Sequence, residues 1–541
     1  MTDAVPAIVD AAEVDSRFGR DALIVTVCTL FSRMTGLVRV IVAAAVLSTG
    51  VLGDTYSAAN LVPNLIFELV AGGVVQAVLV PSFVAARRIS DDELGRSAGA
   101  VVAVLTAVLA AIAAVVMLMS PLIARGLSSL DHDPTVAADK LRVMQPMLLV
   151  FIPQIIFYGI GLVATAALAA RRRFAAAALA PAVNNLVVIT CYLLYRASRA
   201  GERASLDLDE WQFALLAGGT TLGVIAFTAV PGIVLRAQGI KWGPRWDLEN
   251  PAVEALRGSV GWAMLSVVGT LVPTGAAVLF GFGVEGGVAV FMFAFAFFVL
   301  PHALIAVPVA TAVAPRVADS WQRGNVADTG LLIERSARTI VPLLALAGAG
   351  MAALSWPAAR LVGSFGQAAS QGYAPIAHAM AWFGAGLLGY GMAFLMTRVL
   401  FSIGDVQQAA ILITVAAAGG VAIMAAATAV MPRADRAAAL ALGYGATQTI
   451  SAALLTARAR RVTGAPTWSA VGRLTIGSGV AAAVAAAAML IVQRPFGTAR
   501  IDEAAAILVA GTVGVLVFVA LIGPLAGVDV RALRRRGAVG G

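Results

Sequence analysis

Long apolar segments recur along the whole chain and constrain its fold more than any other feature. Fourteen such segments, separated by short charged or Gly/Pro-rich loops, take up most of the 541 residues. A membrane-spanning helix needs about 20 predominantly apolar residues, and every segment reaches that length. Only 12% of the residues are charged, whereas a soluble domain carries about 25%. The sequence therefore predicts an all-α integral membrane protein and excludes a large soluble enzyme, a disordered chain and a nucleic-acid binder.

The fourteen predicted spans are apolar runs that end at charged or loop-forming residues. They cover residues 23–47, 56–86, 98–120, 141–170, 175–195, 211–235, 259–282, 287–314, 336–357, 376–402, 407–430, 437–457, 469–493 and 503–526. Many of them contain proline, which removes a backbone hydrogen bond. In lipid such breaks persist only where protein or a water-filled cavity satisfies the freed backbone groups.

The basic residues in the loops predict the orientation of the chain. If the N-terminus is cytoplasmic, the loops on that side carry about twice as many Lys and Arg residues as the outer loops. Basic residues collect in cytoplasmic loops, so we predict a multi-pass plasma-membrane protein with both termini cytoplasmic. The first twenty residues carry four acidic residues and no apolar run, and we expect no cleavable signal peptide there.

Two similar segments indicate an internal repeat. VPNLIFELVAGGVVQAVLVPSF from Val62 and LPHALIAVPVATAVAPRVA from Leu300 both open with an apolar residue and proline, and both have a second proline before a charged loop. Repeated lobes are common in secondary transporters, so we expect two six-helix lobes and two added helices. The predicted parts are a cytoplasmic N-terminus (1–22), an N-lobe (23–237), a cytoplasmic linker (238–258), a C-lobe (259–461), a C-terminal helix pair (462–527) and a basic cytoplasmic tail (528–541).

Motifs of other functional classes do not occur in the sequence. The two lysines, Lys140 and Lys241, lie outside any GxxxxGK[ST] phosphate loop, so ATP hydrolysis is not expected. Three scattered histidines and two cysteines form no pattern typical of a metal site. We expect no cofactor and no metal, and an enzyme is the weaker class.

Two arginines inside the first span are candidates for an anion-binding site, because a charge in hydrocarbon is costly unless it is paired or hydrated. Arg33 and Arg39 flank Gly36 in SRMTGLVR. Six residues turn an ideal helix by about 600°, so the two side chains share a face only if the helix kinks at Gly36. A guanidinium suits a phosphate or diphosphate. The alternative is that these side chains extend to the cytoplasmic interface.

The second span carries a polar face. The spacing of Asn60, Asn64 and Glu68 places them on one side of a helix, and Gln76 follows. We expect these residues to line a central cavity, where Glu68 neutralises an arginine or carries a proton or a sodium ion. A hydrogen-bonded ladder between helices would explain the asparagines equally well. Asp54 precedes this span as a gating or structural residue, or as a helix N-cap.

Three polar residues of the C-lobe complete the candidate set. His302 follows Pro301 in the eighth span and either binds substrate or donates to a carbonyl freed by the proline. Arg398 and Asp405 bracket the inner end of the tenth span. There we expect an ion pair with a structural or gating role.

Several segments resemble one transporter family in their order and spacing. They are SRMTGLVR from Ser32, Asp54, ANLVPNLIFELVAGGVVQAVLVPSF from Ala59, RRRFAAAALAPAVNNLVVI from Arg171, LPHALIAVPVATAVAPRVA from Leu300 and TRVLFSIGD from Thr397. Together they resemble the MurJ/MviN lipid II flippases of the multidrug/oligosaccharidyl-lipid/polysaccharide exporter superfamily. The resemblance covers nearly the whole chain, and the bias toward Arg and Ala is typical of an actinobacterial member.

The resemblance implies export of lipid II, the lipid-linked peptidoglycan precursor, from the inner to the outer leaflet by alternating access. Arg33 and Arg39 match the family's first-span arginines, and Asp54 matches its acidic position. In the family, cationic cavity residues hold the diphosphate and sugar head, and the last two helices form a groove for the polyprenyl tail. The implied partners are the undecaprenyl-linked precursor, membrane lipids and proteins of cell-wall synthesis or division, in a role in cell-wall biogenesis and cell shape.

Three positions depart from the family pattern. Phe67 and Ala296 stand where the family has cavity arginines, and Val40 stands where it has an acid. Either a different set of residues grips the head group, or the chain moves a related lipid. A cation-coupled drug exporter with Glu68 as the coupling site also remains open, as does a cell-wall scaffold that transports nothing. Coupling to the membrane potential or to a cation is equally open.

Overall fold

The fold is built from helices. The computed structural model describes the backbone of residues 11–71, 74–129, 131, 133–199, 201–257, 262–370, 372–432, 435–464 and 467–527. It describes the side chains of these residues except 11–26, 70–71, 74–77, 257 and 263. Within these ranges the chain forms nineteen α-helices and one π-helical segment, and no strand occurs among the described residues. The predicted all-α fold class is confirmed.

The helices fall into two bundles and a terminal pair. The N-terminal bundle contains α1 (Ala11–Leu47), α2 (Val51–Ala71), α3 (Val74–Ile89), α4 (Asp91–Ser128), α5 (Pro134–Phe151), α6 (Gln154–Ala170), α7 (Phe174–Ser198), α8 (Glu210–Phe213), the π-helical segment η1 (Ala214–Gly218) and α9 (Gly219–Ala237). The short helix α10 (Pro251–Arg257) lies in the connection. The C-terminal bundle contains α11 (Trp262–Phe282), α12 (Gly287–Gln322), α13 (Val326–Ala353), α14 (Ser355–Gly363), α15 (Ala374–Ser402), α16 (Val406–Val430) and α17 (Arg436–Thr463). The terminal pair is α18 (Trp468–Val492) and α19 (Arg500–Ala526).

Thirteen of the predicted spans correspond to segments long and apolar enough to cross a membrane in the described part of the chain. The remaining span, predicted over 56–86, corresponds to two helices. They are α2, which ends at Ala71, and α3, which begins at Val74. The fourth span, predicted as one run over 141–170, consists of α5 and α6, which meet at Ile152 and Pro153. Proline lacks the N–H that would continue the hydrogen-bond ladder, and α6 therefore starts as a new helix.

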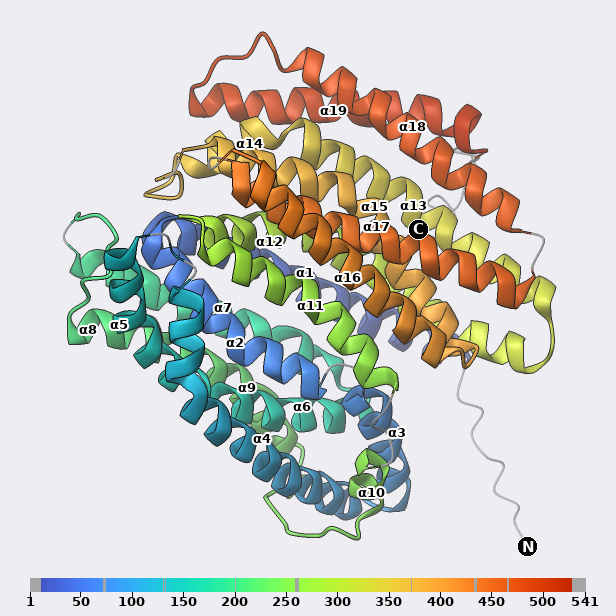
Figure 1. Ribbon diagram of the computed structural model, residues 1–541. Helices are drawn as coiled ribbons and strands as arrows, with labels where there is room; N and C mark the ends of the chain where they lie inside the picture. Colours follow the sequence, from blue (N-terminus) through green and yellow to red (C-terminus); the bar gives the residue numbers. More distant parts are fainter. Residues whose placement is uncertain are drawn as a thin grey trace, which may run out of the picture.

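The two bundles lie side by side, with α1, α2, α11 and α12 where they meet (Figure 1). In the N-terminal bundle α1 packs on α7, and α9 packs on α6 and α7. In the C-terminal bundle α15 packs on α12, α13 and α17. The described buried apolar side chains form one large cluster in each bundle. Phe282 and Val288 at the α11–α12 corner join the N-terminal cluster, so the bundles are in apolar contact there.

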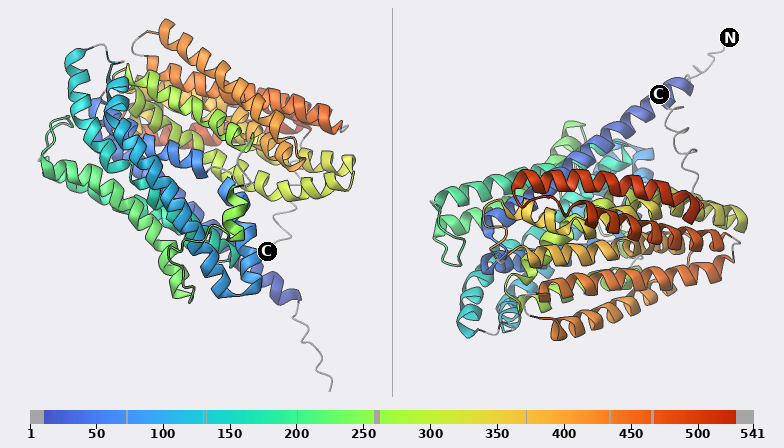
Figure 2. Two further views of the ribbon diagram at one scale, coloured as in Figure 1. Left: turned by 60° about the horizontal axis from the view of Figure 1, so that its bottom comes forward. Right: turned by 90° about the horizontal axis from the view of Figure 1, so that it is seen from above.

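The terminal pair packs on the outside of the C-terminal bundle. Helices α18 and α19 contact each other, and they lie against α13 and α14 (Figures 1 and 2). Large side chains along the pair remain exposed, among them Ile476, Leu508 and Leu516. In a membrane protein such side chains face lipid, so the pair extends the apolar surface of this bundle.

Glycines allow a close helix contact in the C-terminal bundle, between α15 and α17. A Cβ atom added to Gly386 would lie 2.5 Å from the Cα of Gly445, a backbone atom that cannot rotate away. We therefore expect Gly386→Ala to force the helices apart and to cost about 1–3 kcal/mol, as overpacking does. Thermal unfolding of the purified protein measures this loss.

Gly350 provides the matched control for this substitution. It lies inside α13, and a Cβ added there meets no other atom within 4 Å. Alanine is favoured over glycine by about 1 kcal/mol within a helix, so Gly350→Ala should be neutral or stabilising. Equal stability of the two variants would contradict the proposed role of the Gly386 contact.

Candidate functional site

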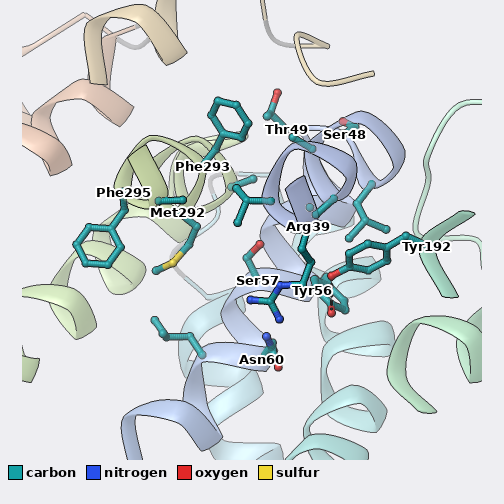
Figure 3. Close-up of a pocket in the computed structure, with 18 of the residues that line it drawn as sticks. Arg39, Ser48, Thr49, Tyr56, Ser57, Asn60, Tyr192, Met292, Phe293 and Phe295 are labelled. Carbon is teal, nitrogen blue, oxygen red and sulfur yellow. Dashed lines mark hydrogen bonds between the residues drawn. The ribbon is translucent and has the colours of Figure 1, made fainter. Parts of the chain in front are cut away.

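A cavity of about 260 Å³ lies where the two bundles meet. Its walls come from α1, α2, α7 and α12. The lining side chains that carry polar groups include Arg39, Ser48, Thr49, Tyr56, Ser57, Asn60, Asn64 and Tyr192 (Figure 3). The α12 side contributes apolar groups, namely Met292, Phe293, Phe295 and Ala296. The cavity is thus polar on one wall and apolar on the other.

Among the described residues that line this cavity, Arg39 supplies the only charge. Its side chain is half-buried, and its guanidinium points toward Tyr56, Ser57 and Asn60 (Figure 3). Within the described part of the chain, no hydrogen bond or ion pair engages this guanidinium. A cation with no protein counter-ion in a membrane protein is suited to an anionic ligand.

Three hydroxyl groups form an ordered chain on the polar wall. The Tyr192 hydroxyl donates to Tyr56 at 2.8 Å, and the Tyr56 hydroxyl lies 2.6 Å from Thr220. Thr220 in turn donates to the carbonyl of Leu216 in the π-helical segment. Because Tyr56 is buried and bonded on both sides, it holds a fixed orientation beneath Arg39. These hydroxyl contacts could not be predicted from the sequence, since the three residues lie on three different helices.

The two asparagines lie together on the cavity wall, as their spacing predicts. The side-chain amide of Asn64 donates to the Asn60 carbonyl at 2.9 Å. This bond stays within α2, so the inter-helix ladder that would explain both asparagines is not what the structure forms. Both residues are half-buried and line the cavity. The described residues do not include the side chain of Gln76.

Arg33 does not line this cavity, whereas Arg39 does. Helix α1 runs unbroken from Ala11 to Leu47, so Arg33 and Arg39 project in different directions. A Cβ at Gly36 would lie 3.4 Å from the amide of Asn185, which itself donates to Thr35 at 3.1 Å. Gly36 therefore lies in the contact between α1 and α7.

Arg33 and Glu68 belong to a second polar group that faces the C-terminal bundle. Both side chains are exposed, and both lie within electrostatic range of Tyr390. His302 is buried and stacks on Tyr390 with ring centroids 3.8 Å apart. Its Nδ1 has no hydrogen-bond partner among the described atoms. The structure thus places the predicted site residues in two groups instead of one.

Aromatic and small side chains occupy two of the three positions that depart from the family pattern, Phe67 and Ala296. Phe67 stacks on Tyr158 with centroids 5.0 Å apart, and Tyr158 contacts the edge of Phe227. Ala296 lines the apolar wall of the cavity. Neither position offers a charge, and Arg39 is the one cation among the described residues that line the cavity.

Asp54 caps a helix of the other bundle rather than its own. It is fully buried, and its carboxylate accepts hydrogen bonds from the backbone N–H groups of Gly286 and Ala289, at 2.7 and 2.8 Å. These N–H groups belong to the start of α12, which favours a negative charge. The carboxylate therefore ties α2 to α12 across the boundary between the bundles.

Residues 45–49, which precede Asp54, also make hydrogen bonds to the C-terminal bundle. The hydroxyls of Ser48 and Ser370 lie 2.7 Å apart, and Thr49 donates to the carbonyl of Ala368. The backbone N–H of Gln367 donates to the carbonyl of Ala45. We call the contacts of residues 45–54 with 286–289 and 366–370 the inter-bundle latch. Ser48 and Thr49 also line the cavity, so the latch borders it.

Lys140 reinforces the same region and was missed by the sequence analysis. It is fully buried and pairs with Asp131 at 2.7 Å. It also donates to the carbonyl of Phe282 and lies 4.5 Å from the centroid of that ring. The lysine therefore joins α5 to the end of α11. Its position at the start of an apolar run could have indicated a buried, paired lysine.

The expected ion pair between Arg398 and Asp405 is wrong. Asp405 pairs with Arg458 of α17, which donates to it at 2.7 and 3.1 Å. Arg398 instead lies over the ring of Phe394, 5.1 Å from its centroid. The bend after α15 directs Asp405 toward α17, so the nearest arginine in sequence is not the nearest in space.

Comparisons with known proteins agree with this architecture. The family model described as "Lipid II flippase MurJ" matches residues 43–500. Two relatives are each named "Probable lipid II flippase MurJ": one from Rhizobium meliloti (strain 1021), 26% identical over 66% of this chain and 66% of its own length, and one from Rhizobium tropici, 26% identical over 69% and 68%. The alignments thus span about two thirds of these relatives.

Solved structures show the same fold. One titled "Lipid II flippase MurJ, inward closed conformation" matches with a TM-score of 0.71 at 17% identity, over 93% of this chain and 98% of that one. An inward-facing multidrug resistance MATE family transporter of the MOP superfamily matches with a TM-score of 0.61 at 13% identity, over 81% and 98%. The family model covers most of the chain, and this multi-pass membrane protein therefore belongs to the MurJ family of lipid II flippases.

Proposed function

We propose that this protein moves lipid II, the undecaprenyl-linked peptidoglycan precursor, from the inner to the outer leaflet of the plasma membrane. The observation that carries the proposal is the unpaired guanidinium of Arg39 in a cavity between two helical bundles. A diphosphate supplies the charge that this cation lacks, and a guanidinium binds it through two parallel hydrogen bonds. Family membership supports the same substrate.

The head group would be held on the polar wall of the cavity. Arg39 binds the diphosphate, while Asn60 and Asn64 offer amide groups to the sugar head. Arg33, Glu68 and His302 would contact the head group as it enters along the boundary between the bundles. Gln76 is proposed for the same entry path on the basis of its sequence position alone. The apolar wall of α12 contacts the remainder of the substrate.

Transport would proceed by alternating access between an N-lobe (23–237) and a C-lobe (259–461). With both termini cytoplasmic, the inter-bundle latch lies at the outer end of the cavity. The latch is formed in this structure, which corresponds to a state closed toward the outside. The helix pair within 462–527 would carry the polyprenyl tail along the outer side of the C-lobe. Different affinities of the substrate for the two states set the direction, aided by the membrane potential.

This function is transport without chemical conversion, and it requires no cofactor. One competing function has support of its own, because the exposed carboxylate of Glu68 and the MATE-like fold suit a cation-coupled drug exporter. Export of a cationic dye by purified protein in vesicles, unaffected by undecaprenyl lipids, would favour that exporter. A scaffold for cell-wall enzymes would transport neither compound.

The decisive experiment is to deplete the protein in its host and to measure lipid II in each leaflet. Accumulation in the inner leaflet is the expected result. Re-expression of the wild-type chain should restore the distribution, which ties the effect to this protein. An unchanged distribution during growth arrest would overturn the proposal and direct the search toward another lipid.

A further inference from the structure

A second cavity lies at the end of the N-terminal bundle opposite the latch. Its volume is about 510 Å³, and it lies between the end of α3 and the turn that joins α6 to α7. Its lining consists of Val84, Arg87, Arg88, Ala169, Ala170, Arg172 and Phe174. None of these residues lines the Arg39 cavity, so the two sites are separate.

The charge around this cavity is strongly positive. Arg171 and Arg173 flank Arg172, so five arginines gather at the two chain segments. In the described part of the chain, only Arg171 of these five has a carboxylate partner, Asp91, at 3.0 Å. Arg88 and Arg172 are exposed and make no ion pair there. The site therefore carries several positive charges that no carboxylate of the described residues neutralises.

Two of the arginines are held in place by the backbone. Arg87 donates to the carbonyl of Ala170 at 2.8 Å, at the negative end of α6. Arg172 has a φ of +57°, and the N–H groups of Arg173 and Arg172 donate to the carbonyls of Leu168 and Ala169. This is a Schellman helix end, in which the left-handed position usually holds glycine. An arginine there is conformationally unfavourable, so its presence needs a reason other than the turn.

The surroundings of the arginines are apolar and exposed. Phe174 is 45% exposed and Ile89 is 77% exposed. A cationic cavity with large apolar side chains beside it matches the boundary between lipid head groups and acyl chains. Basic pockets of this kind on the cytoplasmic side of a membrane protein bind anionic lipid head groups.

We infer that this cavity binds the head group of an anionic phospholipid of the inner leaflet, with Arg88 and Arg172 on the phosphate and Phe174 against the acyl chains. The inference rests on the orientation given under the proposed function, not on lipid II being the cargo. A bilayer phospholipid is favoured over the cargo because the site lies on α3, α6 and α7, away from the boundary between the bundles.

Arg172→Gly separates a ligand role from a structural one. Glycine suits the left-handed position better than arginine, so the melting temperature without added lipid should stay the same or rise. Affinity for phosphatidylglycerol should nevertheless fall about fivefold, the effect of one basic residue near an anionic lipid. Arg88→Gln should have a similar effect, and the double variant should lose about 25-fold.

The measurement is native mass spectrometry and thermal unfolding of the full-length protein in detergent, titrated with phosphatidylglycerol or phosphatidylcholine. Arg460→Gln is the matched control, because it removes an exposed arginine at the end of α17 and should leave binding unchanged. Equal phosphatidylglycerol binding by Arg172→Gly and wild type would overturn the inference. So would equal stabilisation by phosphatidylcholine, or binding of undecaprenyl diphosphate without any binding of phosphatidylglycerol. Because lipid binding is measured on purified protein, its failure is distinguishable from a failure of transport.

Discussion

Replacing Arg39 with alanine is expected to abolish the ability of the protein to support growth, while its abundance in the membrane stays normal. Arg39 is the only charged residue that lines the cavity between the bundles, and it has no counter-ion in the described part of the chain. Hydrogen bonds to charged groups contribute about 1.5–3 kcal/mol each. Loss of one such bond therefore lowers affinity for a diphosphate by about 10–150-fold, and loss of two lowers it further.

The measurement is complementation of a depletion strain, with lipid II assayed in each leaflet and protein level checked by immunoblot. Arg39→Lys keeps the charge but loses the two parallel donors, so partial function is expected. Arg335→Ala serves as the control, because it removes an exposed arginine of α13 that lies outside the cavity. Full growth with Arg39→Ala at normal abundance would favour a scaffold and would remove Arg39 from the binding site.

The location of Arg39, Asn60 and Asn64 on the wall of a cavity could be predicted from the sequence because their signal is local. A charge or an amide inside an apolar run is costly in lipid, wherever the run packs. The helices could be predicted for the same reason, since an apolar run of sufficient length specifies a span by itself. The break between α5 and α6 was foreshadowed by Pro153, but sequence alone did not show whether the proline would kink one helix or start another.

Contacts between distant segments could not be predicted in the same way. Asp54 was expected as a possible cap of its own helix, yet it caps α12, more than 200 residues away. Asp405 was assigned to Arg398, the arginine nearest in sequence, yet it pairs with Arg458. In each case the residue type predicts that a partner exists, whereas the packing of whole helices decides which partner it is.

The separation of Arg33 from the cavity follows from the same limit. The sequence places Arg33 and Arg39 on different faces of an ideal helix, and only a kink would have brought them together. Gly36 lies where α1 contacts α7, next to the side chain of Asn185. Phe67 and Ala296 carry no charge, as the sequence shows directly. In the structure Phe67 stacks on the ring of Tyr158.

Joining the two bundles covalently at the latch is the second change with a large expected effect. The hydroxyls of Ser48 and Ser370 lie 2.7 Å apart, so the two side chains are in direct contact, as two cysteines must be to form a disulfide. Ser48→Cys combined with Ser370→Cys, in a chain whose Cys28 and Cys191 are replaced by alanine, should therefore form a disulfide under oxidation. Alternating access requires this end of the cavity to open, so transport should stop completely and return after reduction.

The two single-cysteine variants are the controls, and each should transport lipid II with or without oxidant. Cross-linking is followed by the mobility shift of the protein on a gel, and transport by lipid II in each leaflet. Complete cross-linking with undiminished transport would mean that the bundles do not separate at residues 48 and 370, and the latch would then be a fixed hinge.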